Sequence, residues 1–133
     1  MQNRLHSLQR RMVRFIYRMD ARGHVGTEKF RDLSWLVFED RVVYFKLCHV
    51  FKIRCGMAPK YLCDRFQKVS NTHSHNTRGS LSDFHVSKKT AACASSFSYT
   101  AISEWNCLPN ALKQCQSYSA FRCKLKQHLA STY

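Results

Sequence analysis

Glycine and proline are scarce in this sequence, where they occupy 4 and 2 of the 133 positions. The turns of β-sandwiches and β-barrels depend on both residues, because glycine tolerates positive φ angles and proline fixes φ. Apolar residues make up 44% of the chain and aromatic residues 13%, which excludes a disordered tail. The sequence therefore predicts a mainly α fold, a small helical domain of about five to six helices.

Residues 4–19 carry the clearest helical pattern. Their apolar side chains recur at steps of three and four residues, which places them on one stripe of about 100 degrees around a helix. The stripe consists of Leu5, Leu8, Met12, Phe15, Ile16 and Met19. The pattern predicts an amphipathic helix over residues 4–19.

Arginines lie beside this apolar stripe. At about 100 degrees per residue, five of them fall within an arc of about 80 degrees and a sixth lies just outside it. The five are Arg4, Arg11, Arg14, Arg18 and Arg22, and the sixth is Arg10. A run of charge is often only a solvated face, but exposed helices normally include Glu as an i,i+4 partner. A nucleic-acid-binding face and a solvated face both stay open here.

The whole chain is strongly basic, with 22 Lys and Arg against 8 Asp and Glu, a formal net charge of +14. Such an excess repels itself unless a polyanion is close by. It indicates nucleic acid first and an anionic membrane second. The alternative is a fragment whose acidic partner surface lies elsewhere in a longer parent protein.

Glycine and proline predict where the next helices begin and end. Gly23 and Gly26 are expected to break the first helix, and Thr27 to cap a short second one. A third helix is expected from Asp40 to Cys55, because a run of about 16 residues is too long for a typical strand.

The following helix is expected to begin close to Pro59, after a C-terminal cap at Gly56. Its inner side would carry Tyr61, Leu62 and Phe66. Residues 67–82 are almost entirely polar and are expected to form a loop or linker. This pattern divides the chain into a basic helical segment at 1–66, the linker, and a C-terminal segment at 83–133. We expect the parts to pack as one compact unit.

In the C-terminal segment, residues 84–86 and 97–99 alternate over short lengths. They could pair as a small β-hairpin, or the second could begin a helix that carries Ile102 and Trp105. Leu108-Pro109 is expected to restart a helix, and residues 118–129 to form the last one. Trp105 lies in an apolar context and is expected in the core.

Seven cysteines without a C-x-x-C pair resemble neither a disulfide framework nor a zinc site. We expect free thiols and no metal, in an intracellular protein of the nucleus or cytoplasm. No run approaches the roughly 20 apolar residues of a membrane span. The arginine-rich residues 1–19 also fit a mitochondrial presequence, which leaves mitochondria as a minor alternative.

Six short motifs occur in order along nearly the whole chain. They are Leu8-Gln9-Arg10-Arg11-Met12-Val13-Arg14-Phe15-Ile16, Leu33-Ser34-Trp35-Leu36 with Arg41-Val42, Gly56-Met57-Ala58-Pro59-Lys60-Tyr61-Leu62, His75-Asn76-Thr77-Arg78-Gly79-Ser80, Trp105-Asn106-Cys107-Leu108-Pro109, and Phe121-Arg122-Cys123-Lys124-Leu125-Lys126-Gln127-His128-Leu129. Together they resemble the region downstream of the polymerase in jockey-like and chicken-repeat-like non-LTR (LINE-type) retrotransposon reverse transcriptases. Cys107 stands where this family usually has Ser.

The resemblance does not include the polymerase or endonuclease domains. Reverse transcription needs clustered carboxylates that hold two metal ions. Here the only adjacent acidic pair is Glu39-Asp40, which is expected at a helix N-terminus, where carboxylates interact favourably with the helix dipole. We therefore expect no catalytic residue, no cofactor and no enzyme activity. The expected origin is a truncated element copy or a gene derived from one.

The resulting hypothesis is a non-catalytic fragment that contacts RNA or DNA electrostatically and without sequence preference. Its contact residues would be the six arginines of residues 4–22 together with Arg78, whose planar guanidinium suits phosphate in the Thr77-Arg78-Gly79 loop. The alternative is a structural or protein-interaction remnant with no ligand of its own. Such a remnant would self-associate through exposed apolar surface.

Overall fold

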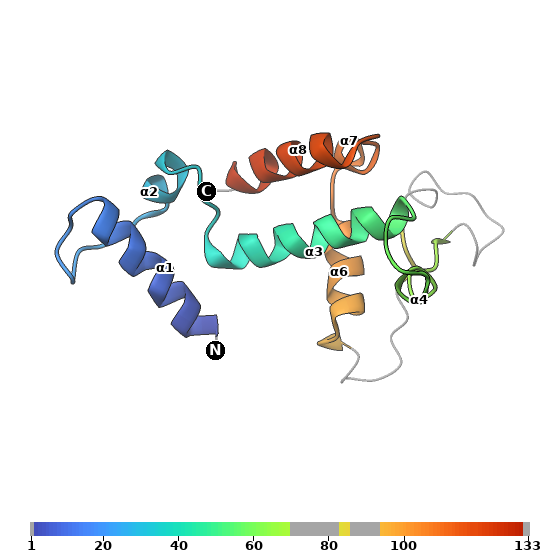
Figure 1. Ribbon diagram of the computed structural model, residues 1–133, viewed down its shortest axis with the longest axis horizontal. Helices are drawn as coiled ribbons and strands as arrows, with labels where there is room; N and C mark the ends of the chain where they lie inside the picture. The colour runs from blue at the N-terminus through green and yellow to red at the C-terminus, as the bar shows by residue number, and fades with distance from the viewer. Residues whose placement is uncertain (1, 70–82, 86–93, 132–133) are drawn as a thin grey trace. The chain divides into compact units, whose positions relative to one another are not determined.

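The computed structural model describes residues 2–69, 83–85 and 94–131, with side chains from Arg4 onward. This part of the chain contains seven helices (Figure 1). They are α1 (Gln2–Ile16), α2 (Thr27–Asp32), α3 (Phe38–Arg54), α4 (Lys60–Cys63), α6 (Phe97–Asn106), α7 (Asn110–Lys113) and α8 (Tyr118–Ala130). The mainly α fold is confirmed, and two of the seven helices, α4 and α7, are single turns of four residues.

The chain divides into two compact units. Unit 1 comprises residues 1–44 and 125–133, and unit 2 comprises residues 45–124. Both α3 and α8 contribute residues to each unit. The three-part division expected from the sequence stays a prediction, since most of the linker at 67–82 lies outside the described residues.

Unit 1 has a small apolar core. The cluster joins Val13 of α1, Phe30 of α2 and Val25 from the loop between these helices, and all three are buried. The partly buried side chains of Leu33, Trp35 and Val37 pack against this cluster. Most of the large apolar side chains of α1 lie outside this cluster and are exposed.

The first helix ends earlier than the sequence predicts. α1 stops at Ile16, and Arg18 adopts a left-handed conformation with φ of 49°. The amide of Met19 donates to the carbonyl of Arg14 at 2.9 Å, and that of Arg18 to Phe15 at 3.2 Å. These two bonds form a Schellman cap, in which glycine usually holds the left-handed position. Because arginine holds it here, the sequence contained no stop signal, and the predicted extension to residue 19 is wrong.

Two other helices end with the same cap. Ser34 follows α2 with φ of 53°, and Gly56 follows α3 with φ of 70°. The amide of Met57 donates to the carbonyl of Lys52 at 2.8 Å, which completes the cap of α3. The predicted cap at Gly56 is therefore correct. The predicted Thr27 cap is not, because Gly26 holds that position and Thr27 is already helical.

Unit 2 has a core of stacked aromatic rings. Phe51 of α3 stacks on Phe121 of α8 with ring centroids 4.4 Å apart, and Trp105 lies 5.8 Å from Phe121. Phe84 lies 6.1 Å from Trp105, and Phe66 packs edge-on against Phe84 at 5.6 Å. All five side chains are buried, which confirms that Trp105 is a core residue.

A hydrogen-bonded clamp holds residue 84 against the turn between α6 and α7. Asn106 donates from Nδ2 to the carbonyl of Phe84 at 2.9 Å and accepts from the Phe84 amide at 3.1 Å. Lys113, only 3% exposed, donates from Nζ to Asp83 Oδ1 and to the Asn106 carbonyl, both at 2.8 Å. The Arg54 guanidinium donates to the backbone carbonyl of Lys113. Buried polar groups need such partners, so the clamp fixes this turn.

The predicted β-hairpin is wrong. Phe84 makes a single antiparallel bridge with Lys68, in which the amide of His85 donates to the carbonyl of Gln67 at 2.7 Å. Residues 97–99 instead form the first turn of α6, as the alternative prediction had it. The Ser96 hydroxyl caps this helix by accepting from the amide of Tyr99 at 3.3 Å.

Candidate nucleic-acid interface

Four of the expected contact residues lie on α1, and we call them the arginine face: Arg4, Arg10, Arg11 and Arg14. The side chains of Arg4, Arg10 and Arg11 are exposed. Among the described residues, none of these three has an ion pair or hydrogen-bond partner. These three guanidinium groups are therefore available to bind an external anion.

Arg14 differs from the other three because it also holds the local structure together. It is half-buried, and its Nε donates to the backbone carbonyl of Gly23 at 2.9 Å. This bond fastens the loop that follows α1 back onto the helix. One edge of the guanidinium is thus occupied, and its other nitrogens can still donate to an anion.

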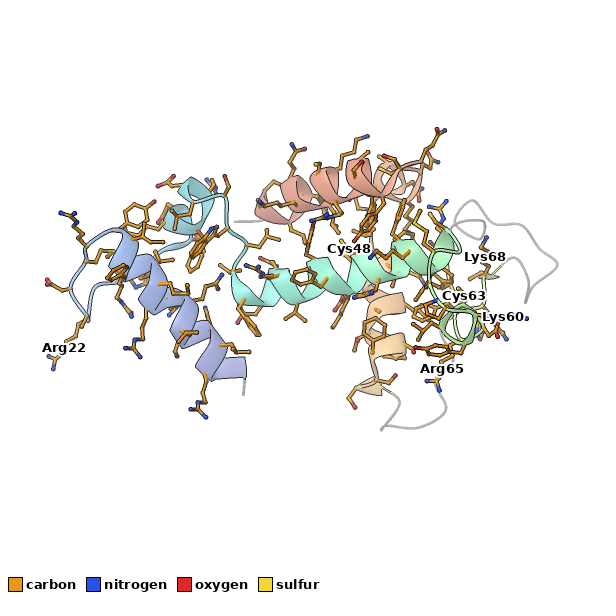
Figure 2. The ribbon with its side chains drawn as sticks, in the orientation of Figure 1. Arg22, Cys48, Lys60, Cys63, Arg65 and Lys68 are labelled. Carbon is orange, nitrogen blue, oxygen red and sulfur yellow. The ribbon has the colours of Figure 1, made fainter. Side chains whose placement is uncertain are left out.

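Arg18 and Arg22 do not continue the arginine face. The predicted arc of about 80 degrees assumed one helix through residue 22. Because the helix ends at Ile16 and Arg18 turns into the left-handed region, both arginines belong to the loop. Both are exposed, and Figure 2 shows Arg22 pointing outward from this loop. Arg78, the remaining predicted contact, lies outside the described residues.

The opposite side of α1 attaches the helix to the rest of unit 1. Val13 is fully buried in the apolar cluster. Gln9 donates from Nε2 to the carbonyl of Leu36 at 2.7 Å, and His6 Nδ1 lies 3.4 Å from Glu39 Oε1. Arg4, Arg10 and Arg11 take no part in this attachment and stay exposed.

The electrostatics of α1 are of one sign, since Gln2–Ile16 contains no acidic residue. Arg10 and Arg14 are four residues apart, and like charges at that spacing destabilise a helix by a few tenths of a kcal/mol. The acidic residues that are nearest to α1 along the chain lie outside the helix. Desolvation, the charge of Asp32 and the hydrogen bond to it raise the pKa of Tyr17, whose hydroxyl lies 3.5 Å from that carboxylate. A bound polyanion would relieve the repulsion among the arginines.

The expectations of no catalytic residue and no metal site stay predictions. Among the described residues, no group of three or more His, Cys, Asp or Glu side chains gathers to hold a metal ion. Glu39 and Asp40 lie in the first turn of α3, the position that the sequence predicted for them. There they interact favourably with the helix dipole.

A second set of exposed cations, which the sequence interpretation did not single out, surrounds α4 in unit 2. Lys60 and Arg65 are exposed and lie at the same end of this unit in Figure 2. Between them Tyr61 is 67% exposed, although it was predicted to face inward. The prediction failed because α4 is a single turn, too short for its periodicity to define an inner face. Exposed aromatic rings beside cations are a common feature of single-strand binding surfaces.

No family model, no curated protein and no solved structure matches this chain. Across the described residues, no helix has the length and apolar character that crossing a membrane requires.

Proposed function

We propose that this protein binds RNA or DNA without sequence preference and without catalysis of its own, through the arginine face of α1. The observation that carries the proposal is the trio of exposed arginines, without a partner in the part of the chain that the structure describes, on a helix that contains no acid. Arginine contacts to phosphate supply most of the affinity in non-specific nucleic-acid binding.

The spacing of these arginines suits a phosphate backbone. Arg4 and Arg11 are seven residues apart, which corresponds to about 10.5 Å along the helix axis. Phosphates of one strand of duplex DNA succeed one another every 3.4 Å or so along the axis, so the two arginines span about three steps. Contacts of this kind position a protein on a strand but read no bases. The expected binding is therefore insensitive to sequence.

We further propose that the chain derives from the region downstream of the polymerase in a non-LTR retrotransposon reverse transcriptase. The six motifs that occur in family order support this origin. In the parent protein, α1 would flank the template or target strand. The nucleotide sequence upstream of the coding region tests the origin: an intact or decayed polymerase segment supports it, and unrelated sequence there contradicts it.

Fluorescence anisotropy titrations with unrelated single-stranded RNA and duplex DNA oligonucleotides test the binding itself. If several phosphates are neutralised, log affinity falls linearly with log salt concentration by about 0.7 to 0.9 for each contact. We expect similar affinities on all sequences and a slope of at least about 3, from the three exposed arginines and their neighbours. Absence of binding at low salt, or a flat salt dependence, would overturn the proposal.

A further inference from the structure

The apolar stripe of α1 is exposed in this structure. We define it as Leu5, Leu8, Met12, Phe15 and Ile16, which are 45%, 53%, 52%, 86% and 47% exposed, respectively. Five large apolar side chains at the surface of one helix of 15 residues form a contiguous patch of a kind that usually marks an interaction site. The arginine face does not explain it, because phosphates do not cover apolar surface.

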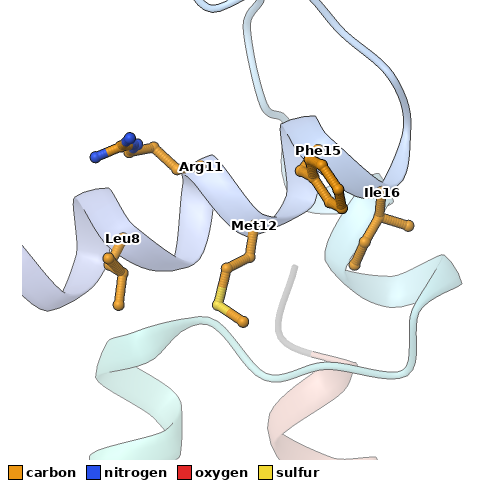
Figure 3. A pocket seen from close by; sticks show the side chains of 5 residues that line it. All are labelled: Leu8, Arg11, Met12, Phe15 and Ile16. Carbon is orange, nitrogen blue, oxygen red and sulfur yellow. The ribbon is translucent and has the colours of Figure 1, made fainter.

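The stripe is not the face through which α1 packs on the core of unit 1. α1 is already attached through a neighbouring part of its surface, where Val13 is buried and Gln9 is bonded to Leu36. An open hollow of about 460 Å³ lies over the stripe, and all of its lining residues belong to α1 (Figure 3). In this view Leu8 and Met12 project to the same side of the helix, and the Arg11 guanidinium points away from them.

The charges beside the stripe determine what can cover it. At about 100 degrees per residue, Arg4 and Arg11 lie next to Leu8 and Phe15 around the helix, and no acid accompanies them. A second copy of this chain would bring two such arginine faces together and would be repelled. The occupant must combine an apolar interior with a negatively charged rim.

We propose that α1 lies in the headgroup region of an anionic membrane surface, with the apolar stripe among the acyl chains and the flanking arginines at the lipid phosphates. A helix with a cationic face, an apolar face carrying Phe and Leu, and low overall hydrophobicity is the form that binds such interfaces. A fluid bilayer also accommodates the protruding ring of Phe15, which needs no preformed pocket there. This binding goes beyond the nucleic-acid proposal and does not rest on it.

Co-sedimentation of the full chain with vesicles tests the proposal. We expect binding to phosphatidylcholine vesicles that contain about a third phosphatidylserine, and little binding to phosphatidylcholine alone. Replacing Leu8, Met12 and Phe15 together by Gln should weaken vesicle binding about tenfold or more, since the burial of these side chains in lipid is lost. The same variant should bind oligonucleotides with unchanged affinity, which separates this proposal from the one above.

A matched control removes three exposed apolar side chains from unit 2 instead. Met57, Tyr61 and Phe97 are 58%, 67% and 44% exposed, and their joint replacement by Gln should leave vesicle binding unchanged. Circular dichroism of both variants checks that the helices remain. Failure to bind anionic vesicles at low salt, or equal weakening by the two variants, would overturn the proposal. A concentration-dependent dimer that the α1 variant abolishes would also overturn it, because a second copy would then cover the stripe.

Discussion

The two units of this chain place their large side chains differently. In unit 2 the rings of Phe51, Trp105 and Phe121 pack against one another in the interior. In unit 1 the interior contains Val13, Val25 and Phe30, while Phe15 of α1 is 86% exposed. Unit 2 thus has a core of its own, whereas α1 displays its apolar and cationic surfaces. Large hydrophobic side chains are thus buried in unit 2, whereas several of those on α1 of unit 1 are exposed, as the proposed binding requires.

The largest expected effect that separates the two units comes from removing one aromatic side chain from each. Trp105→Ala should lower the free energy of unfolding by about 3 to 5 kcal/mol, because it leaves a cavity among buried rings. Phe15→Ala should change it by less than about 0.5 kcal/mol, since the ring lies in solvent. Urea unfolding followed by circular dichroism measures both. A loss at Phe15 comparable to that at Trp105 would show that the stripe of α1 is part of a core.

The polar contacts of the two units should differ in the same direction, by a smaller amount. Lys113→Ala in unit 2 should lower the free energy of unfolding by about 3 kcal/mol, because Asp83 and the Asn106 carbonyl lose a buried partner. His6→Ala in unit 1 should cost at most about 1 kcal/mol, because its contact with Glu39 is largely exposed.

Lys113→Met serves as the control in urea unfolding of this series, because it keeps an apolar stem and removes the charged amino group with its hydrogen bonds. It should be nearly as destabilising as Lys113→Ala. Full stability of Lys113→Met would mean that packing of the stem, rather than the ion pair, fixes the turn after α6.

The smallest expected effects concern the three Schellman caps. Arg18→Gly and Ser34→Gly should each raise the free energy of unfolding by about 0.5 kcal/mol, since glycine adopts positive φ without the steric penalty of a side chain. Gly56→Ala in unit 2 should lower stability by about 1 kcal/mol, although the added methyl meets no atom within 4 Å. Thermal unfolding measures all three. Destabilisation by Arg18→Gly would show that the arginine side chain makes a contact that outweighs its backbone strain.

These caps also show which features the sequence could predict. The end of α3 was predicted because glycine stands at its left-handed position, and the ends of α1 and α2 were not recognisable because Arg18 and Ser34 stand there. Long periodic segments such as α3 and α8 were predicted close to their observed bounds. In the region of the single turn α4, Phe66 is buried as predicted, but Tyr61 is exposed, because one turn carries too little periodicity to define an inner face.

The candidate site was predictable in part for the same physical reasons. Arg4, Arg10, Arg11 and Arg14 lie together because helical geometry alone relates them. Arg18 and Arg22 lie outside this face because a cap ends α1 before them. The sequence did not predict this cap, because arginine and not glycine holds its left-handed position. The bond from Arg14 to Gly23 and the clamp around Lys113 link distant parts of the chain. Such tertiary contacts leave no periodic trace in a sequence.

Two variants of equal charge test whether the arginine face of α1 binds phosphates. The first replaces Arg4, Arg10 and Arg11 by Gln, which keeps the helix because Gln is nearly as good a helix former as Arg. It leaves Arg14 in place, so that the loop stays fastened through Gly23. The second replaces Arg122, Lys124 and Lys126 by Gln, three exposed cations of α8 that belong to neither set of candidate contacts. Both lower the formal net charge from +14 to +11.

Oligonucleotide affinity is then measured for both variants over a range of salt concentrations. We expect the first variant to lose affinity for all sequences alike and its salt slope to fall by about 2 to 3, at 0.7 to 0.9 for each lost phosphate contact. The second should keep most of the slope of the unmodified protein. Equal losses of affinity and slope in the two variants would contradict the claim, because the charge of the protein would then act diffusely and not through α1.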